Sequence, residues 1–273
     1  MGRAPLLPVD QRSISMRLPK LVLSLSLFAF ASCSLPQLDV APRYAQLSLE
    51  GDFGISSGGA TANGDLETMG LDDSEGAPGV RADFAWSGAH VIVSSTAVEF
   101  SGSGVADTTF TSGGVTIPSG ATVDSDLDLG LHSAIVLWDI FPGDMIEISA
   151  GLGVTLIDFE MNIVDTGSSM SVNADETLPV PLLAANAGVM LGDLEANLLV
   201  SGFSISADGN SGSYIDLDAS LRYKLFGGQN HVRTSIIAGW RQIDIELDYT
   251  DSGDNIDGDI RVSGPYLAFE VTL

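Results

Sequence analysis

Apolar and polar residues alternate with a period of two along most of the chain after Tyr44. Between Ala121 and Leu137, one parity carries the apolar side chains Val123, Leu127, Leu129, Leu131, Ile135 and Leu137, and the other carries Asp124, Asp126, Asp128 and His132. Successive side chains of a β-strand point to opposite faces of the sheet. The alternation therefore predicts a strand with one apolar face and one acidic face.

The same alternation recurs in ten segments, which predicts an all-β chain. The predicted strands are 43–56, 79–86, 90–100, 121–138, 145–164, 178–191, 195–206, 214–226, 231–249 and a last strand ending at Leu273. The third and seventh alternate weakly, so eight strands are the alternative to ten. The parity of the apolar residues changes near Ile157 and again near Arg241, and each change predicts a β-bulge, in which one extra residue shifts the phase.

The predicted connections alternate between long and short. The long ones are 57–78, 101–121, 165–177, 207–213 and 250–258, and the short ones are 87–89, 139–144, 192–194 and 227–230. Long loops at one end and tight turns at the other are typical of outer-membrane barrels, whose short turns and termini face the periplasm. A sheet that crosses lipid must close to pair its backbone groups. We therefore predict a closed antiparallel transmembrane β-barrel, with a soluble or lipid-anchored surface β-sandwich binding module as the alternative.

Composition supports an exported barrel and argues against nucleic acid as a partner. Hydrophobic residues make up 45% of the chain, whereas the formal net charge is −25. Both are expected together if apolar side chains face lipid and carboxylates face water. Phosphate backbones would be repelled by such a charge, so no nucleic-acid partner is expected.

The N-terminal residues have the features of an export signal. The apolar run Leu21–Ala31 follows three basic residues between positions 12 and 20, as in a secretory signal peptide. We predict a signal peptide over residues 1–32, with Met16 as an alternative start. Ala29–Ala31 matches ordinary signal-peptidase cleavage, and Phe30–Cys33 matches a lipoprotein signal that would leave Cys33 lipidated.

A short linker over residues 33–42 is predicted to precede a single barrel domain over residues 43–273. Cys33 is the only cysteine in the chain. An intramolecular disulfide and a cysteine-based metal site are therefore excluded.

One parity of the predicted strands carries many charged residues, which we assign to the barrel lumen. The predicted lumen carboxylates are Asp83, Asp124, Asp126, Asp128, Glu147, Asp158, Glu160, Asp216, Asp218, Asp244 and Glu246. The predicted basic partners are Arg81, Arg222, Lys224, Arg233, Arg241 and Arg261. A small barrel is filled by side chains or holds a thin channel. The lumen is thus predicted to be either a network of ion pairs or a narrow path that prefers cations.

No catalytic or metal-binding motif is predicted, and we expect the protein not to be an enzyme. His132 is predicted to point inward beside an outward Ser133, so the two side chains could not meet, and no Gly-x-Ser-x-Gly elbow is present. A barrel hydrolase is the remaining enzymatic alternative. The acidic segment 251–259 lacks the spacing of an EF-hand, so no metal or other cofactor is expected. Residues 66–73 are predicted to form a short helix or a lid.

The export signal, the ten alternating segments, the loop pattern and the amphipathic last strand resemble the small outer-membrane β-barrels of Gram-negative bacteria, the OmpA/OmpW-like group. The resemblance extends from Tyr44 to Leu273. It implies a place in the bacterial outer membrane, with lipid as a partner, and a structural role or a narrow, passive, porin-like conduit with an acidic lumen. It also implies that the barrel-assembly machinery binds the C-terminal strand. Those barrels usually end in an aromatic residue, whereas this chain ends in Leu273, with Phe269 at the same parity.

Overall fold

The computed structural model of the chain describes residues 37–273 apart from 58–59, 72, 107, 113–114, 144, 208–209, 227–231 and 252–253. The predicted signal peptide and Cys33 lie outside the described residues. Every regular element in the described part is a β-strand. The same part contains no helix that is long and apolar enough to span a bilayer.

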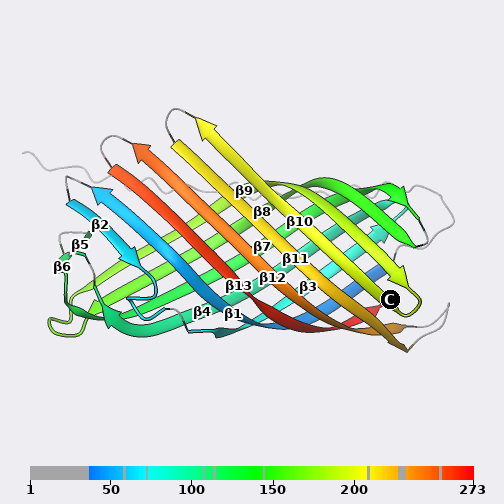
Figure 1. Cartoon of the computed structure of the whole chain (residues 1–273), viewed down its shortest axis with the longest axis horizontal. Helices are drawn as coiled ribbons and strands as arrows, with labels where there is room; N and C mark the ends of the chain where they lie inside the picture. Colours follow the sequence, from blue (N-terminus) through cyan, green and yellow to red (C-terminus); the bar gives the residue numbers. More distant parts are fainter. Residues whose placement is uncertain are drawn as a thin grey trace, which may run out of the picture. The chain divides into compact units, whose positions relative to one another are not determined.

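Ten antiparallel strands form a closed barrel (Figure 1). They are β1 (Gln37–Ser57), β3 (Glu75–Trp86), β4 (Ala89–Val105), β7 (Thr122–Pro142), β8 (Ile146–Asp165), β9 (Ser171–Leu191), β10 (Leu194–Ala207), β11 (Asn210–Phe226), β12 (Arg233–Asp251) and β13 (Asp254–Thr272). The ring closes because β13 pairs with β1, from Asp39 opposite Thr272 to Ser56 opposite Asn255. This closure confirms the ten-stranded barrel and rules out both the sandwich and the eight-stranded alternative.

Most strands are longer than the sequence predicted, and the loops at one end are correspondingly shorter. β7 has 21 residues and β13 has 19, compared with the roughly 9–11 residues that a membrane-spanning strand needs. β2 (Ala60–Asp65) pairs with β1, while β5 (Phe110–Ser112) and β6 (Val115–Ile117) form a separate hairpin. These three strands lie at the end of the barrel opposite the C-terminus (Figure 1). We call these two ends the long-loop end and the short-turn end.

The two halves of the barrel have opposite chemistry on their outer faces. In the short-turn half, apolar side chains point outward, and Leu183 and Leu267 are 62% and 63% exposed. In the long-loop half, the inward parity is apolar, so Leu127 of β7 is 1% exposed while its neighbours Asp126 and Asp128 lie exposed on the outer face. The outer face is thus an apolar belt at one end and an acidic surface at the other.

The two predicted β-bulges are wrong. The ladders of β8 and β12 pass Ile157 and Arg241 without a register shift. The register shifts that do occur with β7 and β11 lie near Asp139 and Phe226. The backbone continues regularly, and the apolar residues change parity because the outer face passes from the apolar belt to the acidic surface.

A hydrophobic core fills the long-loop half of the barrel. The inward side chains Leu47, Leu49, Phe100, Leu127, Leu131, Ile243 and Val262 are each at most 2% exposed. They come from β1, β4, β7, β12 and β13, and the same core includes Met161 of β8 and Tyr214 of β11, so it extends across the full width of the barrel. Such dense apolar packing leaves little room for water.

The turn that follows β2 is inserted into this core. Leu66, Met69 and Leu71 are each at most 1% exposed. A Cβ atom on Gly102 of β4 would lie 1.7 Å from the carbonyl oxygen of Gly70, so the turn lies directly against the inner face of β4 and requires a glycine there. The predicted short helix is wrong, and the segment instead forms a hydrogen-bonded turn that closes the barrel from inside.

β9 and β10 pair over only part of their length. Their ladder ends where Leu183 faces Gly202, although β9 continues to pair with β8 beyond that point. Pro179 and Pro181 lie in this continuation. Both prolines lie within β9, where the ladder to β10 has ended. A proline has no N–H to donate, which explains why it is accommodated next to an unpaired side.

Candidate functional site

A polar cavity of about 330 Å³ lies beneath the hydrophobic core, inside the short-turn half. It extends from Gln37 and Thr272 at the strand ends to Arg43 and Tyr266. Its charged lining consists of the carboxylates Asp39, Asp83, Glu147, Glu195 and Glu270, the basic residues Arg43, Arg81, Arg222, Lys224 and Arg233, and His90. With five carboxylates and five permanently basic side chains, this lining is balanced rather than strongly acidic.

Only part of the predicted lumen face points inward. The inner face carries Asp83, Glu147, Asp216 and Asp218 together with Arg81, Arg222, Lys224, Arg233 and Arg241. The outer face carries Asp124, Asp126, Asp128, Asp158, Glu160, Asp244 and Glu246 together with Arg261. The prediction is wrong for this second group, because the long-loop half buries its apolar parity and turns its charges to solvent. Sequence reasoning also missed Asp39, Arg43, Asp139, Glu195 and Glu270, which share the inward parity of their strands.

Two buried arginines form a polar layer between the cavity and the core. The hydroxyl oxygen of Thr96 accepts hydrogen bonds from Arg43 Nη2 at 2.6 Å and from Arg241 Nη1 at 3.1 Å. Arg241 also pairs with Asp216, and Arg43 lies 3.6 Å from Asp218. Buried charges are tolerated when they are paired and hydrogen-bonded. The layer therefore connects β1, β11 and β12 by ion pairs, and joins β4 to them by the hydrogen bonds to Thr96.

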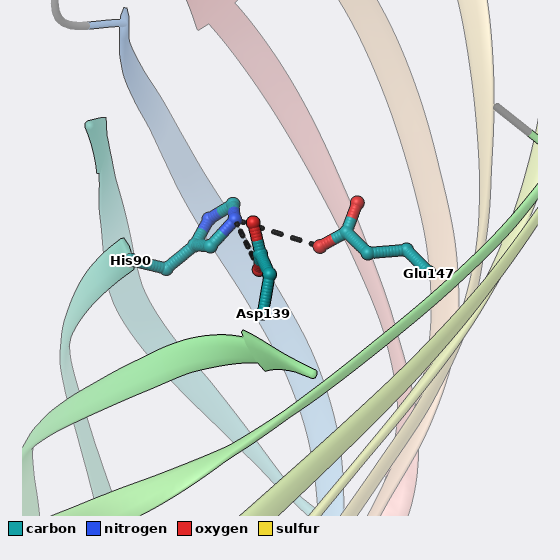
Figure 2. A group of neighbouring side chains, drawn as sticks. All are labelled: His90, Asp139 and Glu147. Atoms are coloured by element: carbon teal, nitrogen blue, oxygen red, sulfur yellow. Dashed lines mark ion pairs between the residues drawn. The ribbon is translucent and has the colours of Figure 1, made fainter. Parts of the chain in front are cut away.

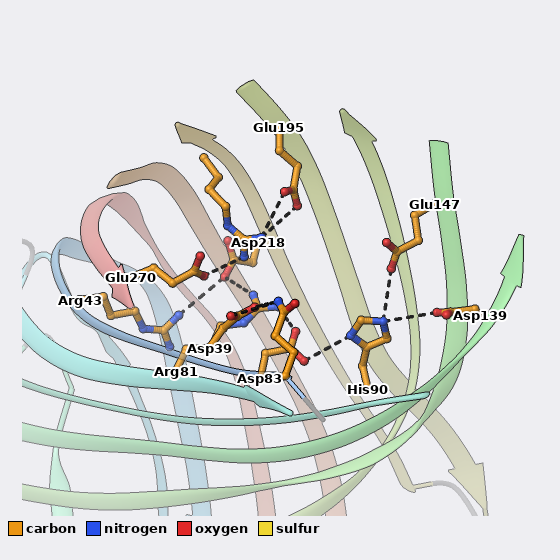
Figure 3. Close-up of polar contacts among 12 residues, drawn as sticks. Asp39, Arg43, Arg81, Asp83, His90, Asp139, Glu147, Glu195, Asp218 and Glu270 are labelled. Atoms are coloured by element: carbon orange, nitrogen blue, oxygen red, sulfur yellow. Dashed lines mark hydrogen bonds and ion pairs between the residues drawn. The ribbon is translucent and has the colours of Figure 1, made fainter. Parts of the chain in front are cut away.

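A second network lies closer to the short-turn end (Figure 3). Arg222 Nη2 lies 2.8 Å from Glu270, and Arg222 Nη1 donates to both carboxylate oxygens of Glu195 at 3.2 Å. Arg81 lies 3.9 Å from Asp83 and from Asp218. Since these residues come from β3, β10, β11 and β13, the network holds opposite walls of the barrel at fixed positions.

His90 is surrounded by carboxylates at the short-turn end of the cavity (Figure 2). Its Nε2 atom lies 3.4 Å from Asp139 and 3.5 Å from Glu147, and its Nδ1 atom lies 3.3 Å from Asp83. The neighbouring turn fixes this arrangement, because the Asp139 N–H donates to the carbonyl oxygen of Gly88 at 3.0 Å. One nitrogen and two carboxylate oxygens from His90, Asp139 and Glu147 lie within 4.8 Å of one another.

This group, which we call the His90 cluster (His90, Asp139 and Glu147), has the donor set of a divalent metal site. Imidazole and carboxylate ligands suit first-row metals such as Zn²⁺ and Mn²⁺. A metal-binding histidine usually donates its second ring N–H to a carboxylate, and Asp83 occupies that position. Three carboxylates contact this single imidazole, so a neutral His90 would leave their negative charge for a bound cation to neutralise.

Comparisons with known proteins identify the fold but no family. No family model matches the chain, and no curated protein matches it. Among solved structures, the outer-membrane protease OmpT of Escherichia coli aligns over 87% of this chain and 97% of its own, with a TM-score of 0.51 and 7% identity. A FadL homologue of Pseudomonas aeruginosa also aligns, over 87% of this chain and 90% of its own, with a TM-score of 0.34 and 11% identity. Ail, the attachment invasion locus protein of Yersinia pestis, aligns over 85% of this chain and 99% of its own, with a TM-score of 0.32 and 10% identity. The likeness to OmpT and the closed ring of ten strands together show that the chain has the fold class of Gram-negative outer-membrane β-barrels.

Proposed function

We propose that this protein is a closed outer-membrane β-barrel that does not conduct ions through its lumen. Its apolar belt would lie in the bilayer, its short turns in the periplasm and its acidic surface outside the cell. The apolar belt supports this placement, because exposed side chains such as Leu183 and Leu267 would otherwise contact water. The likeness in fold to outer-membrane β-barrels supports this placement as well.

The hydrophobic core is the observation that supports a closed lumen. An ion that entered from the periplasmic cavity would meet the polar layer at Arg43 and Arg241 and then the apolar side chains above it. Moving an ion into such surroundings without its hydration shell is strongly unfavourable. A structural barrel is therefore favoured over the porin-like conduit, and the charge balance of the cavity lining weakens the argument for cation preference.

Conductance in planar bilayers tests this function. The refolded chain is first checked for heat-modifiable gel migration and is then added to a bilayer under applied voltage. We expect no unitary current steps from the folded protein. Reproducible steps of constant amplitude would contradict a closed barrel and favour the conduit.

Metal binding in the periplasmic cavity is a second candidate function, supported by the His90 cluster. Titration calorimetry with Zn²⁺ and with Mn²⁺ on the folded, detergent-solubilised chain would measure it. We expect one site that is lost in His90→Ala and weakened in Glu147→Gln. His132→Ala and Glu160→Gln are matched controls, because those side chains lie on the outer face, and binding that these controls reduce equally would contradict the assignment.

A further inference from the structure

A second group of polar side chains lies on the outer face of the barrel. Ser95 Oγ lies 2.9 Å from His132 Nδ1, and His132 Nε2 lies 3.3 Å from Asp158 Oδ2. Thr177 donates its hydroxyl proton to the other oxygen of Asp158 at 2.7 Å. The order is hydroxyl, imidazole and carboxylate, with the imidazole between the other two. This outward placement of His132 corrects the prediction that it points inward beside Ser133.

The strand ladders hold this group in place. Ser95 of β4 is directly opposite His132 of β7, and Asp158 of β8 is directly opposite Thr177 of β9. Gly130 faces Asp158 across the β7–β8 ladder. A Cβ atom on Gly130 would lie 3.2 Å from the Asp158 Cβ and 3.3 Å from His132 Nε2, so the absence of a side chain there leaves space for the pair.

The group lies at the boundary between the apolar belt and the acidic surface. The next outward residues toward the short turns are apolar, and Val93 and Leu156 are 50% and 40% exposed. On the other side, an open groove of about 600 Å³ passes over the small outward residues Gly76, Ala97 and Gly130 and reaches Asp158. His132 and Asp158 have 44% and 47% of their side-chain surface exposed, so a molecule at this boundary can reach them.

We propose that Ser95, His132 and Asp158 form a hydrolytic site for acyl esters of lipids whose ester groups lie at the membrane boundary. A hydroxyl becomes a nucleophile when an adjacent imidazole takes its proton and a third group orients that imidazole. Such a site is recognised by geometry and roles rather than by sequence position. The choice of a lipid substrate rests on the proposed membrane location, whereas the nucleophile assignment does not.

The reaction has two balanced steps. Ser95 Oγ attacks the ester carbonyl carbon while His132 Nδ1 accepts the hydroxyl proton, and the proton then passes to the departing alcohol as the ester C–O bond breaks. Water next attacks the acyl-serine, giving up its proton through His132, and releases the carboxylic acid and free Ser95. Asp158 accepts the Nε2–H of the imidazole, which leaves Nδ1 free to act as the base. Asp158 is thus a positioning residue.

Covalent labelling with a fluorophosphonate tests the nucleophile. We expect the folded, detergent-solubilised chain to gain one adduct, located at Ser95 by peptide mass spectrometry, and Ser95→Ala to gain none. Ser101→Ala is the matched control, since Ser101 lies on the same outer face of β4 away from His132, and it should label fully. Failure of the folded protein to label, or labelling that persists in Ser95→Ala, would overturn the proposal.

Hydrolysis of a long-chain p-nitrophenyl ester in mixed micelles tests the roles of the other two groups. We expect His132→Ala to lose roughly 10²-fold or more in kcat, and Asp158→Asn to lose at least about 10-fold and to change the pH profile through the wrong tautomer. Unchanged heat-modifiable migration of each variant separates a catalytic effect from misfolding. An active wild type whose rate and pH profile are unaffected by Asp158→Asn would reject its positioning role. Conductance plays no part in either measurement, so failure here and failure of the closed-barrel function are distinguishable.

Discussion

Arg241 and Asp216 meet through two parallel hydrogen bonds inside the barrel, Nε to Oδ1 at 3.0 Å and Nη2 to Oδ2 at 2.7 Å. Their side chains are only 6% and 12% exposed. Removing one partner of a buried pair leaves an uncompensated charge and costs about 3–5 kcal/mol. We therefore expect Asp216→Ala to lower the free energy of unfolding by that amount, measured by urea titration in detergent micelles.

The control for this prediction is an ion pair on the outer face. Arg261 donates to Asp244 at 2.6 Å, but its side chain is 50% exposed. Exposed pairs contribute about 0–1 kcal/mol because water and salt screen them. Asp244→Ala should therefore change the unfolding free energy by no more than about 1 kcal/mol. Equal losses in the two variants would show that burial of the Arg241 pair does not determine its contribution.

Gly102 should be essential for the closed state of the barrel. A Cβ at this position would lie 1.7 Å from a backbone oxygen of the inserted turn, so Gly102→Ala must displace the turn or the strand. We expect the variant to lose thermal stability and to show current steps in planar bilayers. Gly188→Ala is the matched control, because its Cβ would have no neighbour nearer than 3.6 Å. A Gly102→Ala barrel as stable and silent as the wild type would refute this role.

Two exposed tryptophans lie near the two edges of the apolar belt. Trp138 and Trp240 are 51% and 48% exposed on the outer face, near the short turns and near the acidic surface respectively. Replacing the other two tryptophans by phenylalanine leaves either Trp138 or Trp240 as the single tryptophan of a variant. In vesicles containing brominated lipids, we expect the bromine atoms to quench the fluorescence of each of these two variants. Quenching that is absent for both would contradict insertion of this belt into the bilayer.

Metal binding at the His90 cluster should weaken in acid. The imidazole binds a metal only in its neutral form, so protons compete with the metal. We expect the Zn²⁺ affinity to fall as the pH is lowered and to level off at the pH where the imidazole is fully neutral. Calorimetric titrations at several pH values would measure this, and an affinity that rises in acid would exclude His90 as a ligand.

Asp165, the last residue of β8, should titrate at an unusually low pH. The Ser168 hydroxyl donates to its carboxylate at 2.5 Å and the Gly167 N–H donates at 2.8 Å, and both lower the pKa of Asp165. Because these hydrogen bonds favour the ionised carboxylate, they stabilise the folded turn at pH values above the ordinary aspartate pKa of about 3.9. This stabilisation is lost as the pH falls through the lowered pKa of the folded state. An NMR titration should show this low midpoint, and Ser168→Ala should raise it.

The sequence was sufficient to predict the ten strands, their order and the closed barrel, because alternation with a period of two depends only on strand geometry. It misplaced Asp124, Asp126 and Asp128 because the same alternation arises when the apolar face packs inside. Which face points inward depends on whether lipid or water lies outside, and residues such as Leu127 satisfy either arrangement.

The two candidate sites depend on cross-strand register, which alternation alone does not determine. His90, Asp139 and Glu147 come from three strands, and the turn at Gly88 together with the shift near Asp139 brings them into contact. Ser95 and His132 likewise meet because the β4–β7 ladder places them opposite each other. Pairwise register follows from the lengths of the turns and loops between the strands.

The pairing of β1 with β13 also determines when folding can finish. Asp39 lies opposite Thr272, so the final ladder joins residues from the two extremes of the barrel domain. Contacts of such large sequence separation slow folding, since a long loop must be ordered before they form. Until the last strand is available, the first strand keeps an unpaired edge that can join another chain. Completing the ring is therefore the step at which this protein needs protection from aggregation.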